Sequence, residues 1–169
     1  AALLHGGNGF GFLAATKAMT MATERAEQFG IGMVGVKNSN HFGMAACYLL
    51  QAVDAGFAAL VFTNASPAMP VWGGREPLLG TSPFAFGAPG NPPIILDMAT
   101  SVVARGKIRR AAAAGEPIPE GWALDKDGNP TTDAQAGYEG LILPLGGPKG
   151  SGLSLMMEVM AGVMTGAAD

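Results

Sequence analysis

The chain has 169 residues, the length of about one domain. Hydrophobic residues make up 49% and charged residues 14%, which excludes a disordered acidic or basic tail because enough apolar side chain is present to fill a core. The net charge of −3 leaves no basic footprint for nucleic acid. No apolar run reaches the roughly 18 residues that a membrane span needs. The single Cys47 excludes an internal disulfide and indicates a reducing compartment, so we expect a cytoplasmic protein.

Residues 1–62 predict helices alternating with strands. Four apolar residues share one face of a predicted helix: Ala15, Met19, Ala22 and Ala26. Gly30 is placed to end this helix. A buried strand is expected over 31–36. After three possible N-cap residues, a second helix is expected from about His41 to Ala55, followed by a buried strand over 57–62. This alternation is typical of an α/β fold.

The rest of the chain is richer in proline and glycine. Seven prolines between 64 and 93 predict ordered loops with a short strand at 84–88. A strand over 94–96 ends at Asp97, a helix is expected over 100–114, and 115–138 is expected to be loop with a turn at Asp127–Pro130. A glycine-rich loop over 146–152 precedes a Met-rich apolar helix from Leu153. The chain starts without methionine and stops directly after this apolar stretch, so we expect a fragment of a larger protein.

Two glycine-rich segments invite comparison with nucleotide-binding motifs. Gly9-x-Gly11-x-x-Ala14 satisfies the loose dinucleotide fingerprint, but the next strand ends in Val36-Lys37-Asn38 without the acidic residue that would bind ribose. We therefore expect a glycine-rich turn rather than an ordinary Rossmann domain. The second segment, Gly146–Gly152, has the order Lys-Gly-Ser, unlike a phosphate loop. Its backbone N–H groups, Lys149 and the following helix N-terminus suit an anion, although Lys149 could equally be a solvated side chain.

Two titratable residues stand at predicted element ends. His41 is expected at the start of a helix, where the positive helix end keeps the imidazole neutral and able to accept a proton from a substrate hydroxyl; the alternative is a structural capping role. Asp97 ends a strand and could bond a ribose hydroxyl or orient a catalytic group; the alternative is an N-cap of the helix at 100–114, a role that Thr100 could also fill. The only other histidine, His5, is too distant in sequence to predict a metal site, so no metal is expected.

The order and spacing of eight motifs resemble the malate/L-lactate dehydrogenase family, which is distinct from the Rossmann-type lactate dehydrogenases. These motifs cover nearly the whole chain: Ser39-Asn40-His41-Phe42-Gly43, Thr63-Asn64-Ala65-Ser66-Pro67, Trp72-Gly73-Gly74-Arg75-Glu76, Gly80-Thr81-Ser82-Pro83, Asp97-Met98-Ala99-Thr100-Ser101, Gly106-Lys107, Pro130-Thr131-Thr132-Asp133 and Leu145-Gly146-Gly147-Pro148-Lys149-Gly150. Ser82 stands where the family more often has Asn.

The resemblance implies an α/β fold with a mixed, largely antiparallel sheet, flanking helices and a non-Rossmann NAD(P) site, of which residues 1–169 would be the core, truncated at both ends. It implies that His41 donates and accepts the proton at the substrate hydroxyl or imine. Its implied cofactor contacts are His41, Phe42, Gly43, Met44, Ala45, Ala65, Asp97, Met98, Ala99 and Lys149. A Ser-His pair and an Arg that complete the family's active site are absent from this sequence.

The expected function is therefore hydride transfer between NAD or NADP and a small 2-hydroxy or 2-oxo acid, of the malate, lactate, sulfolactate or ureidoglycolate type. The resemblance also implies a homodimer with a small carboxylate substrate and no nucleic-acid or membrane partner. Two alternatives remain. One is a hydrolase using Ser151 or Ser154 with Lys149 as base, which helical spacing and the lack of a nucleophile elbow disfavour. The other is an inactive fragment.

Overall fold

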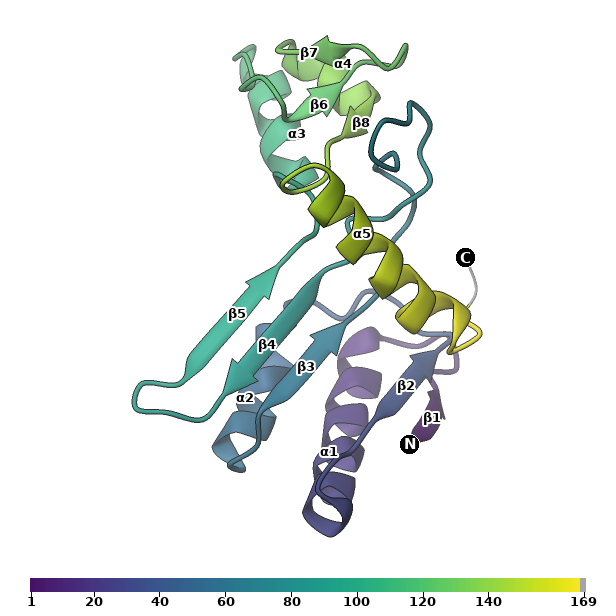
Figure 1. Cartoon of the computed structure of the whole chain (residues 1–169), viewed down its shortest axis with the longest axis vertical. Coiled ribbons are helices and arrows are strands. Elements are labelled where there is room, and N and C mark those ends of the chain that lie inside the picture. The colour runs from purple at the N-terminus through teal and green to yellow at the C-terminus, as the bar shows by residue number, and fades with distance from the viewer. Residues whose placement is uncertain (168–169) are drawn as a thin grey trace. The chain divides into compact units, whose positions relative to one another are not determined.

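A computed structural model describes residues 1–167, and the chain divides into two compact units (Figure 1). Unit 1 contains Ala1–Thr63, Pro83–Met98 and the segment from Val159 onward. Unit 2 contains Asn64–Ser82 and Ala99–Glu158. Each unit is described by itself.

Unit 1 holds a parallel strand pair and an antiparallel sheet. Its elements in chain order are β1 (Ala2–His5), α1 (Gly11–Phe29), β2 (Val34–Lys37), α2 (Ala46–Asp54), β3 (Ala59–Phe62), β4 (Phe84–Ala88) and β5 (Ile94–Met98). Strands β1 and β2 pair in parallel, and α1 connects them. Strands β3, β4 and β5 form the antiparallel sheet in that order, with Ala85 opposite Asp97.

The local signals for α1 are confirmed. Gly30 ends the helix in the left-handed region at φ 81°, where glycine carries no Cβ penalty. Met19 is buried on the predicted apolar face, whereas Lys17 lies on the exposed side. Strand β2 begins at Val34, three residues later than expected. The chain first crosses α1 so closely at Gly32 that a Cβ there would overlap the Ala22 carbonyl.

The second helix begins at Ala46, so the predicted start at His41 is wrong. Asn38 and Gly43 both adopt positive φ angles, 51° and 80°, which interrupt any helix through this segment. Residues 38–45 therefore form an irregular loop between β2 and α2. The helix then packs Leu49, fully buried, against Ala85 of β4 and forms the centre of the unit 1 core.

Unit 2 carries a small antiparallel sheet and three helices among its described residues. Its elements are α3 (Arg105–Ala114), β6 (Ala123–Leu124), β7 (Pro130–Thr131), α4 (Ala134–Glu139), β8 (Leu141–Ile142) and α5 (Pro148–Met157). The π-helical segment η1 (Glu158–Val163) begins at the last residue of unit 2 and continues as part of unit 1. The strand order is β7-β6-β8. The core packs α3 through the fully buried Ile108 against Met69, Leu79 and Ile142.

Three expectations for unit 2 are corrected. Helix α3 starts at Arg105 rather than residue 100, because residues 100–102 bond to Thr81, Leu143 and Leu145 instead. Residues 115–138 contain β6, β7 and most of α4. The predicted turn at Asp127–Pro130 lies where β6 and β7 are joined, but Pro130 is the first residue of β7. Helix α5 starts at Pro148, so Lys149, Ser151 and the glycines after Pro148 belong to the helix rather than to a loop.

Taken together, the described residues confirm a mixed α/β fold that is largely antiparallel, with its strands divided among three sheets. The parallel pair is formed by β1 and β2, which α1 connects. Loops that follow the carboxyl ends of β1 and β2 lie at the same edge of that pair, which is the position where ligands gather in α/β sheets.

Candidate functional site

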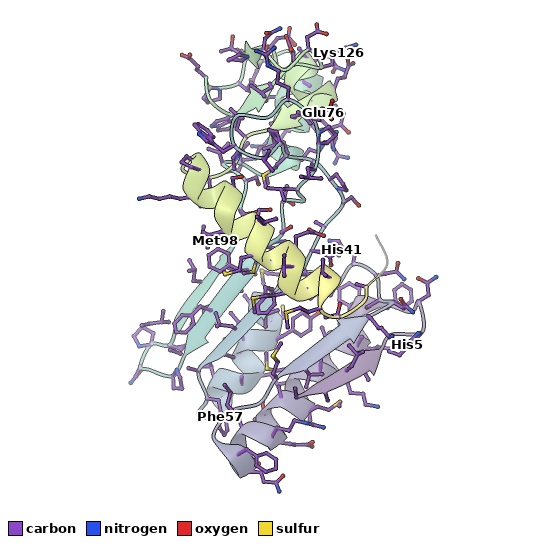
Figure 2. The ribbon with its side chains drawn as sticks, turned by 45° about the vertical axis from the view of Figure 1, so that its right-hand side comes forward. His5, His41, Phe57, Glu76, Met98 and Lys126 are labelled. Atoms are coloured by element: carbon purple, nitrogen blue, oxygen red, sulfur yellow. The ribbon has the colours of Figure 1, made fainter. Side chains whose placement is uncertain are left out.

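The candidate site in unit 1 is built from the two loops that follow β1 and β2. Figure 2 labels His5, the last residue of β1, and His41 from the β2–α2 loop. The loops are packed tightly together: a Cβ at Gly11 would overlap the carbonyl oxygens of Asn40 and His41. This close approach explains the second glycine of the Gly9-x-Gly11 motif, which serves loop packing.

His41 is exposed on this loop and lies five residues before the first residue of α2. The expectation that it stands at the positive end of a helix is therefore corrected. Its Nδ1 atom instead accepts a hydrogen bond from the backbone N–H of Gly43 at 3.0 Å. The turn requires the left-handed conformation of Gly43, whose Cα faces the ring of Phe12 so closely that a Cβ would lie 2.8 Å from Cε1.

The Gly43 contact decides what the imidazole can offer. A neutral imidazole has one N–H and one lone pair. With Nδ1 accepting from Gly43, the proton is carried by Nε2, and the exposed nitrogen is a hydrogen-bond donor. Nε2 gains a free lone pair only when Gly43 releases Nδ1 and the ring proton moves there. Acceptance of a proton at Nε2 would therefore require release of this local contact.

The remainder of the loop is anchored by Tyr48 of α2. Its hydroxyl donates to the Phe42 carbonyl, and the two rings stack with centroids 5.4 Å apart. Burial, followed by the neighbouring Cys47, raises the pKa of Tyr48 above its ordinary value, so the hydroxyl keeps its proton and remains a donor. Ala45 is buried, whereas Met44 is 60% exposed. The loop thus has a fixed backbone and an exposed apolar side chain.

Asp97 joins this loop from β5. Its Oδ2 accepts a hydrogen bond from the N–H of Ala46, the first residue of α2, at 2.8 Å. Helix α2 has no side-chain hydrogen bond from its own N-cap residue, Ala45, so the carboxylate of a distant strand takes that place. The alternative that Asp97 caps the helix over 100–114 is wrong. Its side chain is exposed, and the second carboxylate oxygen can accept a further donor. The next residue, Met98, ends β5 and is half-buried.

In unit 2, Ala65 lies beside the Gly80-Thr81-Ser82-Pro83 motif. A Cβ at Gly80 would overlap the Ala65 carbonyl, so this motif requires glycine for close packing. The fully buried Ser154 of α5 donates its hydroxyl to the Gly80 carbonyl at 2.9 Å. Ser82, also fully buried, has no hydrogen-bond partner for its Oγ among residues 1–167. Ser154 therefore fixes this strip of backbone, while the Ser82 hydroxyl does not.

Ala99 precedes a residue that connects two motifs within unit 2. The N–H and hydroxyl of Thr100 both donate to the Thr81 carbonyl, at 2.9 and 3.0 Å. The Thr100 carbonyl in turn accepts from the N–H of Leu145 at 2.8 Å. The segment after β5 is thus hydrogen-bonded to the strip that leads into the Gly146-Gly147-Pro148-Lys149 turn.

Lys149 is exposed in the first turn of α5. Gly146 and Gly147 adopt positive φ angles, 57° and 61°, and Pro148 supplies the fixed φ of a first helical residue. A Cβ at Gly150 would overlap the Leu145 carbonyl. The Gly147 N–H donates to the Pro144 carbonyl, so the donors at this helix N-terminus are the first N–H groups after Pro148. Together with the Lys149 ammonium they form an arrangement that suits an anion.

The hydrolase alternative finds no support in unit 2. Ser154 is fully buried and bonded to Gly80. The Oγ of Ser151 accepts from the N–H of Trp72 at 3.0 Å, and Ser151 is 7% exposed. Lys149 and Ser151 are two positions apart on a helix, a spacing that places side chains on different faces. The pair cannot act as nucleophile and base in this arrangement.

Residues 1–167 contain no group of three His, Cys, Asp or Glu side chains that could hold a metal ion. None of the described helices combines the length and hydropathy needed to cross a membrane.

Sequence reasoning did not find two residues that fix the site, Tyr48 and Asn40. The Asn40 amide donates to the Asn8 carbonyl at 2.9 Å, across 32 positions of sequence. The tyrosine carried a weak local signal, because an aromatic ring two residues into a helix can contact the loop before it. The asparagine lies in the Ser39-Asn40-His41-Phe42-Gly43 motif, but no local pattern pairs it with Asn8, because the two residues are remote in sequence.

These elements define an α/β protein with a loop-built site on antiparallel and short parallel strands. A sequence model of the malate/L-lactate dehydrogenase family matches residues 1–169. The chain belongs to this family.

Relatives with assigned names are similar over almost the whole chain. It is 49% identical over 168 residues to the L-sulfolactate dehydrogenase of Methanothermobacter thermautotrophicus, covering 99% of this chain and 49% of that protein. It is 43% identical to the (2R)-3-sulfolactate dehydrogenase (NADP(+)) of Chromohalobacter salexigens, covering 95% and 49%. It is 41% identical to the ureidoglycolate dehydrogenase (NAD(+)) of Escherichia coli, covering 98% and 47%.

Among solved structures, the delta1-piperideine-2-carboxylate reductase from Pseudomonas syringae superposes with a TM-score of 0.94 at 35% identity, covering 99% of this chain and 52% of that one. The mixed α/β fold of the family is therefore confirmed. The chain spans about half the length of the curated relatives it matches.

Proposed function

We propose that this protein is an NAD(P)-dependent oxidoreductase that moves a hydride between the nicotinamide and a small 2-hydroxy or 2-oxo acid. The observation that carries the proposal is the family match over residues 1–169, joined to an exposed imidazole on a loop whose backbone is fixed on both sides. Relatives named for NAD(+) and for NADP(+) support either cofactor. Malate, lactate, sulfolactate and ureidoglycolate are the substrate types to test.

In this proposal His41 handles the substrate proton. In the oxidative direction the ring leaves Gly43, places its own proton on Nδ1 and accepts the hydroxyl proton at Nε2. In the reductive direction the imidazolium returns that proton from Nε2, and Nδ1 then keeps its own proton until the Gly43 contact re-forms. When bound, the cofactor supplies the hydride chemistry, and the chain supplies orientation and charge.

The remaining site residues are proposed as cofactor contacts, and each unit offers groups of its own. In unit 1, the loop of Phe42, Gly43, Met44 and Ala45 offers backbone groups and the exposed Met44 side chain. The second oxygen of Asp97 can accept a hydrogen bond from a ribose hydroxyl, with Met98 beside it. In unit 2, Lys149 and the first N–H groups of α5 suit a phosphate, and Ala65 and Ala99 offer backbone contacts.

Three broader properties belong to the same proposal. Residues 1–169 form the NAD(P)-binding core of a larger dehydrogenase, which is supported by matches that cover about half of each relative. The protein is a homodimer in the cytoplasm, and the single cysteine is consistent with that compartment. The carboxylate of the substrate requires a cation, which the resemblance assigns to an arginine outside this sequence.

The test is His41→Ala in the protein, with the hydride transfer followed by the absorbance of the reduced nicotinamide. We expect kcat to fall by about 10²–10⁴, the usual contribution of general acid–base catalysis. Gln28→Ala, an exposed change on α1, is the control and should keep full activity. If His41→Ala is fully active on a substrate that the unmodified protein oxidises, the role assigned to His41 is wrong.

A further inference from the structure

A second histidine, His5, connects the two loops of the unit 1 site. Its Nδ1 lies 3.0 Å from the backbone nitrogen of Gly7, and its Nε2 lies 2.7 Å from the side-chain amide of Asn38. Asn38 is the first residue of the loop that carries His41. His5 thus stands at the end of β1 and reaches across to the loop after β2 (Figure 2).

The chemistry of these two contacts fixes the state of the ring. The Gly7 N–H can only donate, so Nδ1 accepts. The 2.7 Å contact places the Asn38 amide nitrogen, Nδ2, beside Nε2. In the neutral ring Nε2 carries the proton, so two donors would face each other, and we infer that the Asn38 amide is turned to present its oxygen to Nε2. The ring is therefore a connector with one acceptor and one donor, each used by a different loop.

The contact with Asn38 has a conformational consequence. Among the described residues, Asn8 and Asn38 are the non-glycine residues with positive φ, at 57° and 51°. Such a conformation is unfavourable for an L-residue, and after glycine it is tolerated best by asparagine and aspartate. The hydrogen bond from His5 stabilises the side chain of the residue that turns the chain out of β2 into the His41 loop.

A second connection lies two residues further along the loop. Asn40 donates from Nδ2 to the Asn8 carbonyl at 2.9 Å, with the Asn8 Oδ1 and Gly9 carbonyl at 3.2 Å each. The backbone N–H of Asn8 also donates to the Asn38 carbonyl at 2.7 Å. The two loops are hydrogen-bonded at residues 38 and 40, and the second connection ends immediately before His41.

We propose that His5 is a positioning residue for His41, acting through Asn38 and without touching the substrate or the cofactor. The inference rests on the proposed function, because it assigns His5 a part in placing the proton-transferring imidazole. His5 is exposed, so its removal takes little apolar contact from the core. Displacements on the scale of an ångström at a reacting group cost up to about 100-fold in rate. Loss of His5 should therefore lower kcat far more than it lowers stability.

The test uses two substitutions that each retain one of the two contacts. The amide of Gln reaches the position of Nε2, so His5→Gln keeps the bond to Asn38 and loses the one to Gly7. The amide of Asn reaches the position of Nδ1, so His5→Asn keeps Gly7 and loses Asn38. We expect kcat to fall about tenfold in His5→Asn and His5→Ala, with KM changed less than twofold, and to recover to within about twofold of the original in His5→Gln.

The link itself is tested with Asn38→Gly, which keeps a residue suited to positive φ and removes only the amide. If His5 acts through Asn38, His5→Ala and Asn38→Gly should not be additive, and the double variant should be no slower than the slower single variant. Additive losses, an unchanged kcat in His5→Ala, or recovery in His5→Asn instead of His5→Gln would each overturn the proposal.

A readout that does not depend on activity separates this proposal from the proposed function. Amide hydrogen exchange of residues 38–43 should accelerate in His5→Asn and return to its original rate in His5→Gln. If His41→Ala is fully active but this exchange pattern appears, the proposed catalysis fails and the bridge from His5 to the loop stands. If His41→Ala is inactive and neither exchange nor kcat responds to His5, only the positioning role fails.

Discussion

Residues 38–45 in unit 1 and residues 146–152 in unit 2 are both polar or glycine-rich segments that lead into a helix. They differ in how much of the segment belongs to that helix. In the first segment the helix begins at Ala46, later than expected, and in the second it begins at Pro148, earlier than expected. Gly43 needs a positive φ, whereas Gly150 and Gly152 are helical. The number of glycines in a segment therefore does not predict a loop. A loop is indicated by the conformation or the close contact that each glycine allows.

The largest expected effect tests the two helical glycines of α5. A Cβ at Gly150 would overlap the Leu145 backbone, so Gly150→Ala must displace the turn and should lower the free energy of unfolding by about 3 kcal/mol. A Cβ at Gly152 meets nothing within 4 Å, and Gly152→Ala should raise the free energy of unfolding by about 0.5–1 kcal/mol through helix propensity. Denaturant unfolding of the two variants measures both.

The opposite signs make this pair a sharp test of the comparison. If the segment 146–152 were a loop, as the sequence predicts, both substitutions would have similar and small effects. Equal stabilities for Gly150→Ala and Gly152→Ala would therefore contradict the helical start at Pro148.

A smaller effect is expected at the capped end of α2. Asp97→Ala leaves the Ala46 N–H without its partner and should cost about 1–2 kcal/mol of unfolding free energy. Asp97→Asn keeps an oxygen acceptor without the charge and should cost less. Asp133→Ala is the matched control in unit 2, because Asp133 caps its own helix, α4, by accepting from Ala136 at 2.7 Å.

The two caps differ in what they should do to the site. Both alanine variants should be destabilised by similar amounts, but only Asp97→Ala should accelerate amide exchange in the loop that precedes α2. Equal loop exchange in the two variants would show that Asp97 is not what fixes the start of α2.

The same distinction separates what the sequence predicts from what it does not. The helix end at Gly30 and a turn within the predicted segment Asp127–Pro130 were predictable, because their hydrogen bonds join residues within about one helical turn of each other. The turn itself spans Asp125–Asn129, and Pro130 belongs to β7. The start of α2 depends on Asp97, 51 positions away, and the start of α3 depends on the bonds from Thr100 to Thr81. No local pattern contains either partner, so both helices were predicted while their starts were displaced.

For the candidate site, the motifs selected the segments but not the contacts within them. The sequence placed His41 and Asp97 in functional segments, and those assignments stay predictions. Their environments depend on the fold. The His41 imidazole accepts from the Gly43 N–H and does not stand at a helix end. The Asp97 carboxylate accepts from the N-terminus of α2 and does not cap the helix that follows it in sequence.

The smallest of the three effects concerns Tyr48 of α2, which anchors the His41 loop. Tyr48→Phe keeps the ring stacked on Phe42 and removes only the hydroxyl that donates to its carbonyl, so the free energy of unfolding should fall by about 1 kcal/mol.

The pH dependence of stability gives a second measure of the Tyr48 hydroxyl. Burial raises the Tyr48 pKa in the folded state above the ordinary value of 10.0, so its stabilising contribution is complete below that pH and is lost as pH rises through the folded pKa. Stability measured across this alkaline range should fall less steeply in Tyr48→Phe than in the unmodified protein. The control Tyr138→Phe keeps the Tyr48 hydroxyl and therefore keeps that loss of stability. An unchanged alkaline slope in Tyr48→Phe would mean that ionisation of the buried Tyr48 hydroxyl is not the source of that loss of stability.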